Sequence, residues 1–378
     1  MTFTVALYVS GHGYGHAVRS AEVATALLRR GARVVVRSDA PRWLFPEAAE
    51  YVPGEAVDVG VAQHDGLDLD IDETRHRWVA FAATFEARAE VEASRLREEH
   101  VDFVLGDIPP LAFAAAARAG VPNAAIGNFT WDWIYAAWPR FEEAIACVKR
   151  GYRQADVLLR LALHSTDPEA FAAFGTIEDV PLIARRAQRS RASVREELRL
   201  DAADQVVLLS FGAFDATGLD LHGLAELRDY RFVVTPPLAT RATDPPSNVV
   251  CLQKQPDDYA SLLAACDVVV TKPGYGIVAD CLANRIAVLF TSRGPFREYD
   301  VLAHALQTLG RARYVPREDV LAGRLADHLA ALAKQTNPWA NLPMNGAEVI
   351  AENVFHRIAT TTRAQLPKPV TRGAPQAR

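Results

Sequence analysis

Residues 3–9 read FTVALYV and continue directly into SGHGYGH at residues 10–16, followed by AVRSAEVATALLRR at residues 17–30. The first stretch is a short apolar run and predicts a buried strand. The third has helical spacing and is followed by Gly31, a residue that commonly ends helices. A strand, a glycine-rich turn and a helix in this order predict a βαβ unit in an α/β fold with a parallel sheet.

The same alternation continues along the chain and forms two series. In the first half we expect further strands at 33–37, 102–105 and 123–126, with helices at 73–97 and 111–118. The second half has candidate strands at 206–210, 232–235, 249–252, 268–271 and 288–291. The pattern therefore predicts two doubly wound, Rossmann-like domains whose strand ends face each other across a cleft.

The expected domain boundaries follow changes in composition. The 378 residues exceed what one hydrophobic core usually supports. The region around 183–203 is rich in Arg, Ser, Glu and Gln, which is typical of a connection between domains. We therefore expect domains at 1–182 and 204–345, a linker at 183–203, a closing helix at 346–362 and a disordered tail at 363–378.

Composition also limits the expected partners and location. The formal net charge is -5 and no basic cluster is visible, so a nucleic-acid partner is not expected. Cys147, Cys251, Cys266 and Cys281 form no C-x-x-C pair, which favours free thiols and a cytoplasmic protein. We see no secretory signal and no apolar run of about 18 residues, so a membrane-spanning segment is not expected. Peripheral contact with a membrane stays open.

The first glycine-rich turn suggests a ligand site. Gly13 and Gly15 allow the backbone to approach a ligand closely, and the start of the next helix presents N–H groups that favour negative charge. His12 and His16 lie in the same turn at the end of a strand. Imidazole titrates near neutral pH, so either histidine could accept a proton from a hydroxyl group or could serve only to cap the helix.

A dinucleotide-binding site is an alternative interpretation of this turn. Gly11 and Gly13 match the first two glycines of G-x-G-x-x-G, and Asp39 follows at roughly the distance of a ribose-binding carboxylate. The third glycine position, however, is His16, where close packing of helix and strand would exclude a large side chain. A dehydrogenase therefore fits the turn less well than other nucleotide-binding proteins do.

A second glycine-rich turn, KPGYG at residues 272–276, also suggests a ligand site. It follows a predicted buried strand and precedes a helix, so the helix start and Lys272 could hold a diphosphate. Asp280, one turn into that helix, could accept hydrogen bonds from ribose or only stabilise the helix start. In the next polar loop, Glu298 and Asp300 could hold sugar hydroxyls or cap a helix.

Taken together, these segments resemble the GT-B glycosyltransferases. The resemblance is closer to the glycosyltransferase-like domain at the N-terminus of plant L-arabinokinases and to its stand-alone bacterial relatives. The shared stretches are SGHGYGHAVR (10–19), DFVLGDIP (102–109), NFTWDWIY (128–135), DVP (179–181), SFG (210–212) and KPGYGIVADCL (272–282). Their common order along most of the chain is more specific than any single glycine motif.

The resemblance implies roles for particular residues. His16 matches the histidine that closes the corresponding turn, His12 is an additional histidine of this subgroup, and Asp107 matches a carboxylate that orients the base. A ribose-binding glutamate of the family falls on Asp280, which is one methylene shorter. The residues expected to bind the donor are Gly13, Gly15, Gly212, Lys272, Gly274, Tyr275, Gly276, Asp280, Glu298 and Asp300.

The implied reaction is an inverting transfer of a sugar, without a metal or cofactor, from a nucleotide-diphosphate sugar to an acceptor hydroxyl. The expected donor is UDP-linked. Plant arabinokinases continue into a sugar-kinase domain, and this sequence contains no counterpart of it, so kinase activity is not implied. Because the related domain has no well-established transfer reaction, a module that binds a nucleotide sugar without catalysis is the alternative, ahead of the dehydrogenase.

Two further segments have competing interpretations. Trp131, Asp132 and Trp133 follow a predicted strand end, where aromatic rings beside a carboxylate could stack on a sugar acceptor or could pack between domains. The run DLDID at 68–72 resembles the D-x-D metal-binding pattern of other glycosyltransferases. Because it precedes a charged helix rather than following a core strand, we expect it to be a solvated run or to cap the helix, and to bind no metal.

Overall fold

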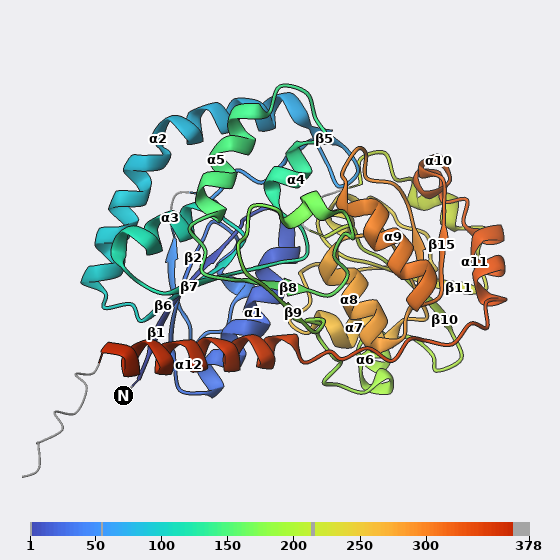
Figure 1. The fold of residues 1–378 in the computed structure, drawn as a ribbon. Coiled ribbons are helices and arrows are strands. Elements are labelled where there is room, and N and C mark those ends of the chain that lie inside the picture. Colours follow the sequence, from blue (N-terminus) through green and yellow to red (C-terminus); the bar gives the residue numbers. More distant parts are fainter. Residues whose placement is uncertain (1, 54–55, 213–215, 366–378) are drawn as a thin grey trace, which may run out of the picture.

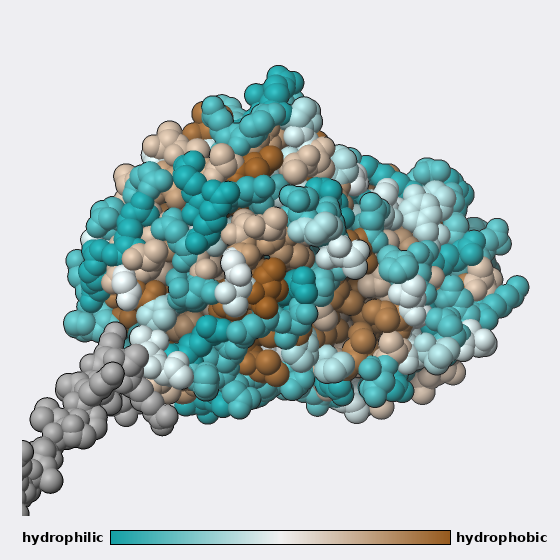
Figure 2. Space-filling view, viewed as in Figure 1, coloured by the Kyte–Doolittle hydropathy of each residue, from teal (hydrophilic) through white to brown (hydrophobic). Residues whose placement is uncertain are grey.

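Two α/β halves lie side by side in the structure, a computed structural model that describes residues 2–53, 56–212 and 216–365. Each half is built on its own parallel sheet with helices packed on it (Figure 1). The face seen in Figure 2 is mainly hydrophilic, with hydrophobic residues toward the middle, where the two halves meet.

The first half contains a seven-stranded sheet. Its spatial order is β3-β2-β1-β6-β7-β8-β9, and every neighbouring pair is parallel. The strands are β1 (Thr4–Val9), β2 (Arg33–Ser38), β3 (Glu50–Pro53), β6 (Phe103–Asp107), β7 (Asn123–Gly127), β8 (Leu158–Leu161) and β9 (Ile177–Val180). The strand order reverses between β1 and β6, and this is where open parallel sheets bind ligands.

Helices cover both faces of this sheet because its strands alternate between two hydrophobic clusters. Val5, Leu7 and Val9 of β1 contribute to one cluster, whereas Ala6 and Tyr8 contribute to the other. The connecting helices are α1 (Gly13–Arg29), α2 (Ile71–Glu98), α3 (Pro110–Ala119), α4 (Trp131–Tyr135) and α5 (Glu142–Tyr152), with the short turns η1 (Arg42–Leu44) and η2 (Pro168–Phe171). A small antiparallel pair, β4 (Ala62–Gln63) and β5 (Leu69–Asp70), precedes α2.

The second half contains a six-stranded parallel sheet in the order β12-β11-β10-β13-β14-β15. Its strands are β10 (Gln205–Leu209), β11 (Tyr230–Val234), β12 (Val249–Cys251), β13 (Val268–Thr271), β14 (Ala287–Phe290) and β15 (Ala312–Tyr314). Its helices are α6 (Arg191–Glu197), α7 (Tyr259–Ala265), α8 (Tyr275–Asn284), α9 (Glu298–Leu309), α10 (Arg317–Leu321) and α11 (Ala326–Ala333), with η3 (Leu221–Leu224) and η4 (Leu238–Arg241). Here the order reverses between β10 and β13.

The last helix, α12 (Gly346–Gln365), returns to the first half and packs against α1 (Figure 1). Three of its residues are fully buried there: Ile350, Ala351 and Val354. They belong to the same hydrophobic cluster as Val5, Leu7 and Val9 of β1. The closing helix therefore ties the end of the described chain to its beginning.

The predicted fold class is confirmed, and each predicted strand is present within a few residues of its expected position. Six short strands, β3, β4, β5, β8, β9 and β15, were not predicted. α1 begins at Gly13, not at residue 17, and α12 continues through 363–365, where we predicted a tail; residues 366–378 lie outside the described part. Among the described residues, no helix is both long and apolar enough to span a membrane.

Candidate active site

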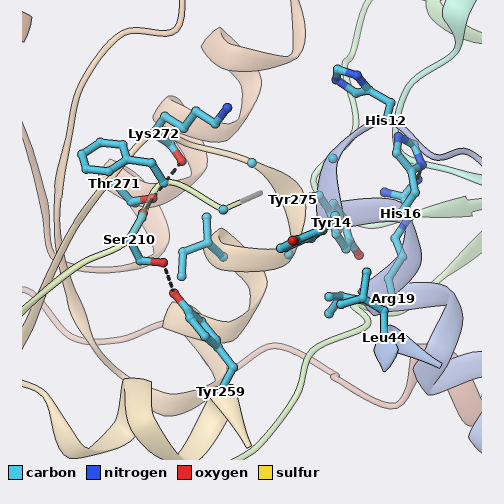
Figure 3. A pocket seen from close by; sticks show the side chains of 18 of the residues that line it. His12, Tyr14, His16, Arg19, Leu44, Ser210, Tyr259, Thr271, Lys272 and Tyr275 are labelled. Carbon is cyan, nitrogen blue, oxygen red and sulfur yellow. Dashed lines mark hydrogen bonds between the residues drawn. The ribbon is translucent and has the colours of Figure 1, made fainter. Parts of the chain in front are cut away.

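A cavity of about 720 Å³ lies between the carboxyl ends of the two sheets. Its walls come from both halves: the start of α1 on one side, and the turns after β10, β13 and β14 on the other. In Figure 3, His12, Tyr14, His16 and Arg19 lie opposite Ser210, Thr271 and Lys272. The cavity thus joins the two points where the strand orders reverse, and its size is typical of small-molecule sites.

Ten of the residues predicted from the sequence line this cavity: His12, Gly13, Gly15, His16, Gly212, Lys272, Gly274, Tyr275, Gly276 and Glu298. Asp107 lies directly behind the wall. Trp131, Asp132, Trp133, Asp280 and Asp300 are not part of the wall among the described residues.

His16 is positioned by the start of α1. Gly13, the first residue of this helix, has a φ of 65°, a left-handed conformation that glycine adopts without strain. The chain can therefore turn sharply after β1, so that His16, 5% exposed, lies beside the end of β6. There its Nδ1 is 2.8 Å from Oδ1 of the fully buried Asp107.

Asp107 is held as a carboxylate by its neighbours. Arg19 and Ser20 donate hydrogen bonds to its Oδ2, of 2.7 and 2.9 Å. Burial opposes the charge, but attraction to Arg19 and His16 outweighs it and keeps the pKa of Asp107 well below its ordinary value. In the tautomer that donates from Nδ1 to this charged acceptor, 2.8 Å away, the lone pair of Nε2 is left to accept another proton.

His12 has a different environment. Its Nδ1 is 3.0 Å from the carbonyl oxygen of Val61, and its ring stacks on Phe296 of the other half. Burial, followed by repulsion from Arg293, His16 and Lys272, lowers the pKa of His12 well below its ordinary value. His12 is therefore neutral at pH 7, and its imidazole can donate a hydrogen bond to a ligand or accept one from it.

The opposite wall combines a cation with a helix start. Gly274 is the N-cap of α8, and the first residues of this helix line the cavity, so their unpaired N–H groups are available to a ligand there. Lys272 lies in the same turn, and burial and the nearby Arg293 lower its pKa well below the ordinary lysine value. A bound anion would stabilise the charged form of Lys272, so this wall suits a diphosphate.

A chain of hydrogen bonds connects the two walls. Arg19 donates from Nη1 to Oδ1 of Asn128 at 2.7 Å, and Asn128 donates from Nδ2 to Oε1 of Glu298 at 2.8 Å. Glu298 is the first residue of α9 and is 4% exposed. The histidine-carboxylate pair of the first half is thus linked, through Arg19 and Asn128, to a carboxylate of the second.

Two carboxylates expected to bind the donor are elsewhere. Asp280 is 1% exposed, and both its oxygens accept hydrogen bonds from Arg185: from the backbone N–H at 2.8 Å and from Nη2 at 2.6 Å. The aspartate side chain, one methylene shorter than the glutamate of the family, thus binds Arg185 in the connection between the domains and does not reach the cavity. Asp300 is exposed in the first turn of α9, where an acid stabilises a helix start.

The aromatic block expected to bind the acceptor is buried behind the cavity. Trp131 is fully buried, donates from Nε1 to Asp58 at 2.8 Å and packs beside both histidines. The carbonyl of Trp133 accepts a hydrogen bond from Arg297 of the second half. The structure thus corresponds to the interdomain-packing interpretation, because these side chains support the wall instead of forming it. Asp132, 2% exposed, lies between these two tryptophans.

The acidic run at 68–72 has structural partners. Asp70 caps α2 by accepting a hydrogen bond from the N–H of Glu73, as predicted. Asp68 pairs with Arg317 of the second half through two hydrogen bonds of 2.6 Å. In the described parts of the chain, no three His, Cys, Asp or Glu side chains form a cluster that could hold a metal ion.

Sequence reasoning missed Arg19, Asn128, Asp58 and Arg293. Arg19 follows His16 by three residues and therefore shares its helix face, a spacing that could have drawn attention to it. Asn128 opens one of the stretches that carry the resemblance, and Arg293 lies in the polar loop that supplied Glu298. For Asp58 the sequence offers no such signal.

The chain is similar in sequence to a plant protein. It is 30% identical over 357 residues to an L-arabinokinase from Arabidopsis thaliana, an alignment that covers 92% of this chain and 33% of the relative. The chain thus spans about a third of the length of that protein. No family model matches the sequence.

Several solved structures of glycosyltransferases share this architecture. The glycotransferase of kitacinnamycin matches with a TM-score of 0.62 at 18% identity, over 97% of this chain and 100% of that chain. UGT89C1 of Arabidopsis thaliana, complexed with UDP, matches with a TM-score of 0.58 at 16% identity, over 95% of each chain. With its two parallel sheets facing one cavity, the chain has the GT-B fold of these glycosyltransferases.

Proposed function

We propose that the protein is a glycosyltransferase that moves a sugar from a nucleotide-diphosphate sugar to an acceptor hydroxyl group. The observation that carries the proposal is the cavity itself, where the His16–Asp107 pair faces Lys272 and the start of α8. A base and a diphosphate site on opposite walls are what transfer of a glycosyl group between two oxygens requires. The similarity to L-arabinokinase and the shared GT-B fold support this assignment.

The proposed reaction uses these positions as follows. Nε2 of His16 removes the proton of the acceptor hydroxyl while the oxygen attacks the anomeric carbon of the sugar. The bond from that carbon to the diphosphate oxygen breaks, and the electron pair leaves with the diphosphate. Attack from the side opposite the leaving group inverts the configuration at the anomeric carbon. The proton stays on His16, whose positive charge is stabilised by Asp107.

The second half stabilises the leaving group. Lys272 and the N–H groups at the start of α8 face the negative charge that develops on the diphosphate, so the proposed reaction needs no metal ion. His12 and Glu298, which both line the cavity, would hold hydroxyl groups of the sugar. UDP is the nucleotide that we propose, in line with its presence in the related UGT89C1 structure.

The test compares transfer and binding in histidine variants. A purified sample is incubated with UDP-sugars and a panel of hydroxyl acceptors, and UDP release and glycosylated product are measured. His16→Ala should lower transfer by roughly 10²- to 10⁴-fold, the usual contribution of a general base, and should leave the Kd for UDP unchanged. His76→Ala, an exposed histidine on α2, is the matched control.

The outcomes separate the proposal from its alternative. Unchanged transfer in His16→Ala would remove His16 as the base. Saturable binding of UDP-sugars with neither transfer nor hydrolysis by the wild-type protein would support a binding module without catalysis.

A further inference from the structure

Arg293 stands out among the arginines of the cavity wall. It follows β14, next to the 272–276 turn that follows the adjacent parallel strand β13. Its side chain is 7% exposed, and the residue lines the cavity. The side chain of Arg293 is therefore close to any ligand that binds at the 272–276 turn.

The guanidinium of Arg293 makes no hydrogen bond to any residue that the structure describes. Its Nε is buried without a partner, and its nearest carboxylate, Glu298, is 3.8 Å from Nη1, beyond hydrogen-bond distance. By contrast, Arg19 and Arg185, which also line the cavity, are bound to Asp107 and Asp280 through short hydrogen bonds. Leaving a buried charged donor without an acceptor costs free energy, so an acceptor group of a ligand would bind favourably at Arg293.

The surroundings of Arg293 fit an anionic ligand. The ring of Phe296 covers one face of the guanidinium at 4.0 Å and leaves its edges for a planar partner. Burial lowers the pKa of Arg293, and attraction to Glu298 offsets only part of that effect. Glu298 already accepts a hydrogen bond from Asn128. A negative charge brought by a ligand would therefore be favourable at Arg293.

The position of Arg293 indicates which part of a donor it meets. Arg293 follows β14, beside the turn that holds Lys272, and the ring of Phe296 that it covers also stacks on His12 of the opposite wall. Arg293 thus lies between the two walls, where the transferred sugar must lie if the proposed reaction occurs. The diphosphate itself has Lys272 and the start of α8.

We propose that Arg293 binds a carboxylate on the transferred sugar, so that the donor is a nucleotide-linked uronic acid. This inference rests on the proposed function, because it assumes that a nucleotide-diphosphate sugar occupies the cavity. A planar carboxylate pairs with a guanidinium through two parallel hydrogen bonds, whereas the hydroxymethyl group of a neutral hexose leaves the charge unmatched.

The experiment measures binding by calorimetry in two rounds. UDP, dTDP and GDP are titrated first, to find which nucleotide binds. The neutral and the C6-carboxylate form of the same sugar are then compared on that nucleotide; for UDP they are UDP-glucose and UDP-glucuronic acid. The variants are Arg293→Gln, which keeps the length and removes the charge, and Arg293→Lys, which keeps the charge. Arg228→Ala, at an exposed arginine of the same half, is the control.

Wild type should bind the acidic form at least about tenfold more tightly than the neutral form. Arg293→Gln should lose that preference with little change in affinity for the nucleotide alone, and Arg293→Lys should keep part of it. Equal affinity of wild type for both forms, or an equal loss for the nucleotide and both sugars in Arg293→Gln, would overturn the inference. Failure of all three nucleotides to bind would instead contradict the proposed function. Thermal unfolding of each variant, compared with wild type, checks that the variant is folded.

Discussion

Gly276 of α8 packs against Gly15 of α1: a Cβ atom on Gly276 would lie 3.8 Å from the Cα of Gly15. The two glycine-rich turns recognised in the sequence therefore meet at the junction of the halves, within the wall of one cavity. Because 3.8 Å is an ordinary van der Waals contact, a methyl group fits there, but a larger side chain must enter the cavity or push α1 and α8 apart.

We predict that Gly276→Ala is tolerated and Gly276→Leu is not. The Gly276→Ala variant should bind UDP as tightly as wild type does. Its free energy of unfolding should rise by up to about 1 kcal/mol, because alanine has a higher helix propensity than glycine. Leucine should weaken UDP binding at least about tenfold, a difference of about 1.4 kcal/mol. Calorimetric Kd values and thermal unfolding check both. Equal affinity of the two variants would mean that the turns do not jointly enclose the ligand.

Asn128 is the next test, because it is the amide through which Arg19 contacts Glu298. Asn128→Ala removes both hydrogen bonds and leaves two buried charged groups with one partner fewer. We expect the free energy of unfolding to fall by about 1–3 kcal/mol for each group left unsatisfied. Urea titration measures the loss, and kcat should fall as well, because Arg19 also holds Asp107.

A double-mutant cycle isolates the link between the halves. Glu298→Gln keeps an oxygen that can accept from Asn128, whereas Glu298→Ala removes the acceptor. The effects of Asn128→Ala and Glu298→Ala should therefore not add, since each removes the same contact. Strict additivity would show that the hydrogen bond contributes nothing to stability.

Much of the site could be predicted from local sequence because parallel sheets place ligands at strand ends. His16, Lys272 and Gly276 each follow an apolar run that forms a central strand, so their positions in the chain determine their positions in the fold. The contacts of Asn128 could not be predicted in this way. Its partners lie 109 and 170 residues away, and only the packing of the two halves brings them together.

The undetected strands have a related cause. β8, β9 and β15 have three or four residues each, too few to show periodicity, and three of the four side chains of β9 are not buried. Their structure depends on pairing with a neighbouring strand, which local propensity does not reveal. Asp280 shows the same limit at the level of one side chain, since its partner Arg185 is 95 residues away.

Asp280→Asn tests whether that carboxylate is structural or binds ribose. The buried pair with Arg185 implies a structural role, so we expect a loss of about 1–3 kcal/mol in the free energy of unfolding. The Kd for UDP should change less than about threefold, below 1 kcal/mol. A tenfold weaker Kd with unchanged stability would instead support the ribose assignment. Asp229→Asn, at an exposed position, is the control.

Asp58 should make stability depend on pH. It is buried beside Trp131, whose ring packs against both histidines, and burial raises its pKa from 3.8 to about 7 despite hydrogen bonds from Ser10 and Trp131. Between pH 4 and 7 the unfolded chain therefore loses the Asp58 proton while the folded protein keeps it. Stability due to this group must fall as pH rises through that window and stay constant above it.

Asp58→Asn removes this titration, so the variant should gain stability relative to wild type as pH rises. An asparagine keeps one acceptor oxygen and loses the other, which shifts its stability by an amount that does not depend on pH. The difference in free energy of unfolding, variant minus wild type, should increase by up to roughly 4 kcal/mol between pH 4 and 7, since each pKa unit corresponds to about 1.4 kcal/mol. Urea unfolding at half-unit steps measures it, with Asp229→Asn giving a flat reference. A flat difference for Asp58→Asn as well would show that Asp58 is charged in the folded protein, and would imply water or rearrangement beside Trp131.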